Sequence, residues 1–206
     1  MIKKLVQLKS TKSMKTLKKE IHFFFDKDCS NLVITPNSVE HGYIALLSED
    51  LDAAEVIFSH IDSPRTKWGN ILISILKGYM TDYPTYFQIR NFFEIDVNFL
   101  LKNNKIHYVE QCLGALDVLS SINQEVYKFS ARVMLENKLY KAALKYMDKS
   151  KQIFYNDAEL HFMYAKYYMD ISYYQDAYIY INECLKLVPE YYPAKIMKKR
   201  IEEIKF

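Results

Sequence analysis

The chain has 206 residues, a formal net charge of +3 and hydrophobic side chains at 50% of its positions, which argues against wholesale disorder. It contains only four Gly and five Pro, too few for a sheet-rich protein that needs a tight turn about every ten residues, so an all-α fold is predicted. Three widely separated cysteines without a CxxC pair exclude a disulfide framework and a thiolate metal site.

Residues 1–30 form a basic arm that holds eight Lys against three acidic residues. Apolar residues at helical spacing predict a helix within 13–26: Met14, Leu17, Ile21 and Phe24. The lysines fit two interpretations, a solvated face of a capping helix or a surface that docks on nucleic acid or on an anionic membrane. The stretch DKDCSN at 26–31 lacks the Gly and the closing Glu of a calcium loop, so no calcium site is predicted there.

The next segment predicts helices with one irregularity. Small residues at helical spacing in GYIALLSEDLDAAEVIF indicate a helix pair over 35–64. Residues 66–79 predict a helix around Trp68, but no second helix follows it, so 65–89 is expected to be irregular. Pro84 then precedes YFQIRNFFEIDVNFLLK, which we interpret as the first helix of the next unit.

The C-terminal half repeats itself. Aligning 124–157 with 158–191 needs no gap, and it places Ala131 over Ala165 and Ala143 over Ala177. In both stretches apolar residues recur every three or four positions on either side of a short polar break, which predicts two helices joined by a tight turn. Residues 90–123 keep the same spacing with bulkier side chains. Small residues are expected where helices cross closely.

With these residues in view, the chain resembles the tetratricopeptide repeat (TPR) family, whose 34-residue unit follows W-x2-L-G-x2-Y, then A-x3-F, then P. The last unit matches it with His161, Tyr164, Ala165, Tyr168, Ala177, Ile181 and Pro189. The resemblance covers about 35–62 and 90–191 and implies a TPR-like α-solenoid of antiparallel helix pairs. Its units would be 35–64, the irregular 65–89, 90–123, 124–157 and 158–191, within a repeat domain of 31–206. A capping helix is expected over 192–206, with one apolar face: Ala194, Met197, Ile201 and Ile204.

The resemblance also implies where a partner would bind, because the first helix of each unit lines a concave groove in this family. The period predicts a polar column beside an apolar one, suited to an acidic, partly hydrophobic segment. The expected partner-binding residues are Asn98, Leu101, Lys128, Arg132, Leu135, Lys166 and Met169. The alternative is that these are solvated helix faces. Binding of a chaperone's C-terminal carboxylate is not predicted, because Glu94 and Phe129 stand where that subfamily has Lys and Asn.

No motif for catalysis was found. The five histidines form no HxxxH pair, and no phosphate-binding glycine loop or GxSxG elbow occurs. The sequence therefore predicts a non-catalytic protein-interaction module without a cofactor or a metal. Apolar runs far below the ~20 residues of a membrane span, and an N-terminus without a signal peptide, make the cytoplasm the expected location. The alternative function is nucleic-acid or membrane docking through the basic arm.

Overall fold

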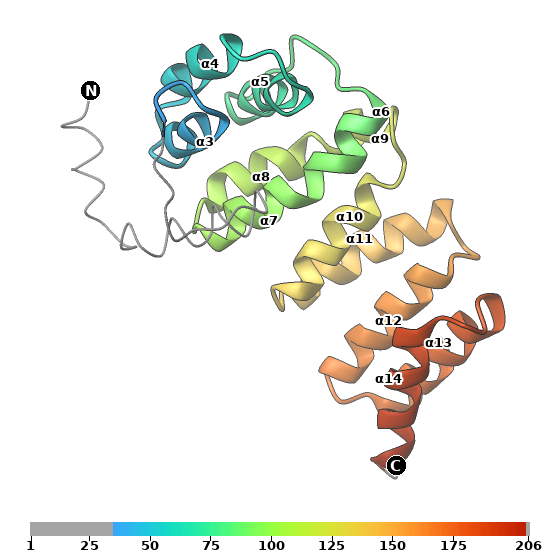
Figure 1. The fold of residues 1–206 in the computed structure, drawn as a ribbon. Coiled ribbons are helices and arrows are strands. Elements are labelled where there is room, and N and C mark those ends of the chain that lie inside the picture. The colour runs from blue at the N-terminus through green and yellow to red at the C-terminus, as the bar shows by residue number, and fades with distance from the viewer. Residues whose placement is uncertain (1–34, 205–206) are drawn as a thin grey trace. The chain divides into compact units, whose positions relative to one another are not determined.

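The computed structural model describes residues 35–204, and all regular structure in that range is helical, which confirms the all-α prediction. The chain divides into two compact units, Met1–Ala115 and Leu116–Phe206, which are described separately (Figure 1). This boundary falls inside the predicted unit 90–123, because the helical path breaks at Ala115 between α8 (Ile106–Gly114) and α9 (Leu116–Ser120). The basic arm, the helix predicted within 13–26 and the segment 26–31 lie outside the described residues, as do 205–206.

The first unit begins with α3 (Val39–Leu47), α4 (Leu51–Ser59) and α5 (Pro64–Leu76), followed by α6 (Tyr86–Gln88), η2 (Ile89–Phe93), α7 (Glu94–Lys102) and α8. α3 and α4 pack as a neighbouring pair, and α5 packs on α4. The side chains of Ser38, Asp50 and Ser63 cap the first three helices by accepting backbone N–H groups.

Two glycines allow the helices of the first unit to approach one another. A Cβ placed on Gly42 of α3 would lie 2.2 Å from the ring of Phe58 in α4, and one on Gly69 of α5 would lie 2.7 Å from the same ring. Any larger residue would displace this fully buried ring. The close approach of α3, α4 and α5 therefore depends on hydrogen atoms at both positions.

The irregularity expected in 65–89 has a structural form. α5 ends at Leu76, and Gly78 adopts a left-handed φ of 84° in the turn that follows. The run from α6 to α7 is helical throughout but contains the π-helical stretch η2. One extra residue in a helical turn rotates the following faces by roughly 100°. This change of register was not predicted from the sequence.

A buried carboxylate on α7 links three helices of the first unit. Asp96, 1% exposed, accepts hydrogen bonds from the Trp68 indole (2.5 Å) and the Tyr43 hydroxyl (3.1 Å), and it pairs with Arg65 (2.5 Å). The Arg65 guanidinium lies 4.6 Å from the centre of the Tyr43 ring. Burial acts most strongly on the pKa of Asp96 and raises it, whereas the ion pair with Arg65 and the hydrogen bonds oppose that shift.

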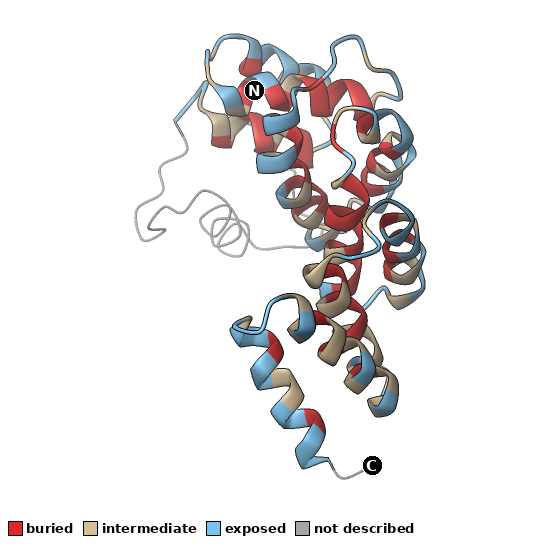
Figure 2. Cartoon of the chain, turned by 90° about the vertical axis from the view of Figure 1, so that its right-hand side faces the viewer, coloured by how far each residue is buried: buried red, intermediate tan, exposed pale blue. Residues whose placement is uncertain are grey.

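The second unit consists of α9, α10 (Val126–Glu136), α11 (Tyr140–Ile153), α12 (Ala158–Asp170), α13 (Tyr174–Leu187) and α14 (Tyr192–Glu203). α10 packs on α11, α12 packs on α13, and α14 packs on α13. Along the helices of this unit, the buried residues lie on the sides that face neighbouring helices (Figure 2). On the cap, α14, Ala194 and Ile201 are buried as predicted, whereas Ile204 is exposed.

The turns between paired helices recur with the period found in the sequence. Asn104, Lys138 and Ser172, each 34 residues from the next, adopt left-handed φ angles of 58°, 60° and 65°. In every case the following backbone N–H bonds to the carbonyl five residues earlier, as in a Schellman motif: Lys105 to Leu100, Leu139 to Met134 and Tyr173 to Tyr168. The repeat is therefore present in the backbone as well as in the sequence.

The small residues that the repeat aligns are buried at helix contacts. Ala131, Ala143, Ala165 and Ala177 are all fully buried. Among residues 35–204, no helix combines the length and apolar character required to cross a membrane.

Candidate partner-binding surface

Lys128 on α10 is buried within an ion-pair cluster. Its side chain is 6% exposed, and Nζ lies 2.7 Å from Asp157 and 3.2 Å from Glu159, with Glu125 at 3.6 Å. Burial lowers the pKa of Lys128, but the carboxylates outweigh this effect, so the pKa is raised and the side chain stays charged. Lys128 therefore joins α10 to α12 and has no charge to spare for a partner.

Asp157 holds both Lys128 and the start of α12. Its Oδ1 accepts the backbone N–H of Leu160 at 2.9 Å as the N-cap, while Oδ2 accepts from Lys128. An anionic cap also interacts favourably with the positive end of the helix dipole. One side chain thus starts α12 and bonds it to the preceding helix.

Arg132, one turn after Lys128, also has an acidic partner within the chain. Its guanidinium lies 2.5 Å from Glu159, and its charged group is 5.8 Å from the centre of the Phe129 ring. The two cations predicted to face a partner thus lie among three carboxylates. This part of the surface is closer to neutral than its lysine and arginine suggested.

The remaining predicted residues of the second unit differ in their accessibility. Leu135 is only 2% exposed and belongs to the core. Lys166 and Met169, both on α12, are half-buried. Lys166 makes no ion pair with any residue in 35–204. Phe162, one turn before Lys166, packs edge-on against Tyr191 at 5.3 Å between ring centres.

The predicted site residues are distributed over both units. Asn98 and Leu101 lie half-buried on α7 of the first unit. Lys128, Arg132 and Leu135 lie on α10, and Lys166 and Met169 on α12, so the structure groups these five on two neighbouring helices of the second unit.

The sequence argument missed residues that share this surface. Arg200 on α14 follows Lys166 by the same 34 residues, is exposed, and makes no ion pair with a described residue. The period itself could have identified it. The roles of Asp157 and Glu159 depend on how α10 and α12 pack, so the period alone could not reveal them.

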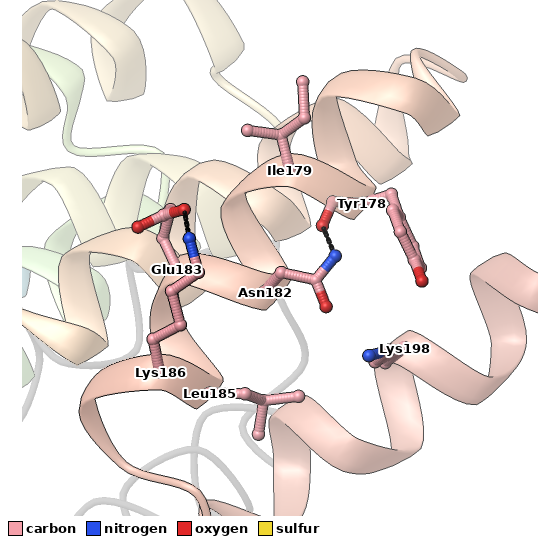
Figure 3. A pocket seen from close by; sticks show the side chains of 7 residues that line it. All are labelled: Tyr178, Ile179, Asn182, Glu183, Leu185, Lys186 and Lys198. Atoms are coloured by element: carbon pink, nitrogen blue, oxygen red, sulfur yellow. Dashed lines mark hydrogen bonds and ion pairs between the residues drawn. The ribbon is translucent and has the colours of Figure 1, made fainter.

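A second concavity lies between α13 and α14. It is an open hollow of about 630 Å³, lined by Tyr178, Ile179, Asn182, Glu183, Leu185, Lys186 and Lys198. Figure 3 shows Lys198 extending from α14 into the space beside Tyr178 and Asn182 of α13. The Lys198 ammonium lies 5.4 Å from the centre of the Tyr178 ring.

The titratable groups of the described residues are in settings typical of packing. Burial raises the pKa of the Cys184 thiol to about 11 and also raises that of Cys112, so both thiols stay protonated at neutral pH. Burial lowers the pKa of His161, whose ring lies 6.0 Å from that of Tyr180. Within 35–204, no three His, Cys, Asp or Glu side chains are arranged to hold a metal ion.

Comparisons of this chain with models of protein families, with curated proteins and with solved structures found no match.

Proposed function

We propose that the chain is a TPR-like helical-repeat module without catalytic activity, which binds a segment of another protein along the first helices of its repeat units. The observation that carries this proposal is the recurrence of one turn geometry at Asn104, Lys138 and Ser172, together with the fully buried alanines at the paired crossings. Stacked helix pairs of this kind build extended surfaces whose outer residues are free to specify a partner.

The binding surface that we favour is narrower than the one predicted from the sequence. It comprises Lys166 and Met169 on α12, with Arg200 on α14 as an extension at the same period. Lys128 and Leu135 are buried and act by holding the helices in place. Two cations without acidic partners beside an exposed thioether favour an acidic, partly apolar segment.

The test compares two charge reversals in the same unit. Lys166→Glu alters the proposed surface, and Lys141→Glu makes the same change at an exposed position of α11, the second helix of its pair. Both variants and the parent protein would be used for affinity capture from the native lysate, with bound protein and bound nucleic acid quantified. We expect a discrete protein that Lys166→Glu loses and Lys141→Glu retains.

Two results would contradict the proposal. Equal recovery of every bound protein by both variants would show that the α12 surface is not used. Recovery of nucleic acid alone, abolished by deleting residues 1–12, would favour docking through the basic arm.

A further inference from the structure

The hollow between α13 and α14 corresponds to a space that is filled one repeat earlier. Asn182 and Lys198 line the hollow, and the residues 34 positions before them are Asp148 and Tyr164. In that earlier unit the Tyr164 hydroxyl donates to Asp148 at 2.6 Å, and Tyr180 of α13 stacks on Tyr164 at 4.8 Å between ring centres. The second helix of a pair thus supplies an aromatic ring that covers this position.

α14 is the first helix of a unit whose second helix is absent from the described residues. Its counterparts of Tyr164, Ala165 and Tyr168 are Lys198, Lys199 and Glu202, which are polar. The wall contributed by α13 remains partly apolar, because it includes Leu185 and Ile179, the latter 57% exposed. The hollow therefore combines apolar side chains with a polar edge from α14.

The charges in the hollow favour one kind of occupant. Lys186 is already paired with Glu183 on α13. Lys198 makes no ion pair with a described residue, and its only described neighbour of note is the Tyr178 ring. A lysine over one aromatic face can accept a second ring or a carboxylate from a ligand.

We propose that this hollow binds an amphipathic helix of a protein partner, which takes the place of the missing second helix and presents an aromatic side chain, with an acidic neighbour, to Lys198. The inference rests on the repeat architecture of the proposed function but uses a different face from its Lys166 surface. A volume of about 630 Å³ accommodates one large side chain and its neighbours on a helix.

The test uses α13 itself as the model for such a helix. A fluorescent peptide with the sequence of residues 174–187 contains the ring of Tyr180 and the carboxylates of Asp176 and Glu183. A matched peptide carries alanine in place of Tyr180. Binding of both to the full chain would be measured by fluorescence anisotropy, and to three variants of the chain: Lys198→Glu, Ile179→Glu and Arg200→Glu.

We expect the tyrosine peptide to bind about fivefold or more tightly than the alanine peptide, in line with a partly desolvated cation–π contact. Lys198→Glu and Ile179→Glu should each weaken its binding by a similar factor, while Arg200→Glu should leave it unchanged. Circular dichroism of each variant would establish that the helices are intact.

Three outcomes would overturn the inference: equal binding of the two peptides, no detectable binding, or binding unaffected by both Lys198→Glu and Ile179→Glu. If Arg200→Glu alone weakened binding, the peptide would occupy the surface of the first helices. That result would refute the hollow as a docking site and leave the proposed function standing.

Discussion

The buried carboxylate of Asp96 should be a major source of stability in the first unit. Asp96→Asn keeps the shape of the side chain but removes the charge that compensates Arg65. Removing one partner of a buried ion pair costs about 3–5 kcal/mol. The Arg65 side chain is 15% exposed and lies against aromatic rings, so water partly compensates its charge and the lower end of the range applies. We expect a loss of about 3 kcal/mol in the free energy of unfolding.

The chain carries its own probe for this experiment. Trp68 is the only tryptophan, and its indole donates to Asp96. Urea unfolding followed by tryptophan fluorescence therefore reports on the first unit. The matched control is Asp62→Asn, since Asp62 is 87% exposed and pairs with Lys67 at 2.8 Å. This change should cost less than about 1 kcal/mol.

The reasoning also predicts a rescue. Replacing both partners, as Arg65→Met with Asp96→Leu, removes the buried charges together and should recover most of the stability lost in Asp96→Asn. The ion-pair explanation would be refuted if Asp96→Asn cost no more than Asp62→Asn, or if the double variant were less stable than Asp96→Asn.

Three further predictions concern the second unit and can be checked by urea unfolding followed by circular dichroism. Lys138→Gly should stabilise the protein by about 0.5–1 kcal/mol because glycine adopts a left-handed φ without steric cost; a loss of stability would contradict this. Ala177→Leu should overpack the contact between α12 and α13 and cost about 1–3 kcal/mol, and an unchanged midpoint would show that Ala177 does not lie at a crossing. Burial raises the pKa of Asp157, but the hydrogen bonds from Lys128 and from backbone N–H groups outweigh it, so the pKa lies below its ordinary value of 3.8. Its contribution to stability is therefore complete above that value and is lost as the pH falls through the lower folded-state pKa, so Asp157→Asn should flatten the acid limb of the stability curve; an unchanged limb would refute this role.

The helix pairs of the second unit could be predicted because their information is local. Alternating apolar spacing and a polar break define each helix and turn without reference to distant residues. The left-handed turns at Lys138 and Ser172 follow the same period, although neither residue is a glycine. The π-helical stretch before α7 could not be predicted, because Ile89–Phe93 has the composition of an ordinary buried helix.

The candidate site was harder to predict because burial and pairing depend on contacts between helices. The period placed Lys128 and Leu135 correctly on α10, but it could not show that Asp157 and Glu159 of the next pair neutralise Lys128. The same limit applies to Asp96, whose partners Arg65 and Trp68 lie about 30 residues earlier on another helix. A periodic pattern identifies the helix on which a residue lies, whereas the packing of neighbouring helices decides whether that residue is accessible.

The most direct measurement of partner binding would be site-specific photo-crosslinking in the native cells. A photoreactive residue would replace Lys166 on α12 in one protein and Lys141 on α11 in another, and the crosslinked products would be identified by mass spectrometry. If α12 lines the binding surface, position 166 will crosslink to one discrete protein that position 141 does not capture. Identical products at both positions, or none at position 166 while position 141 reacts, would contradict the binding surface proposed for this chain.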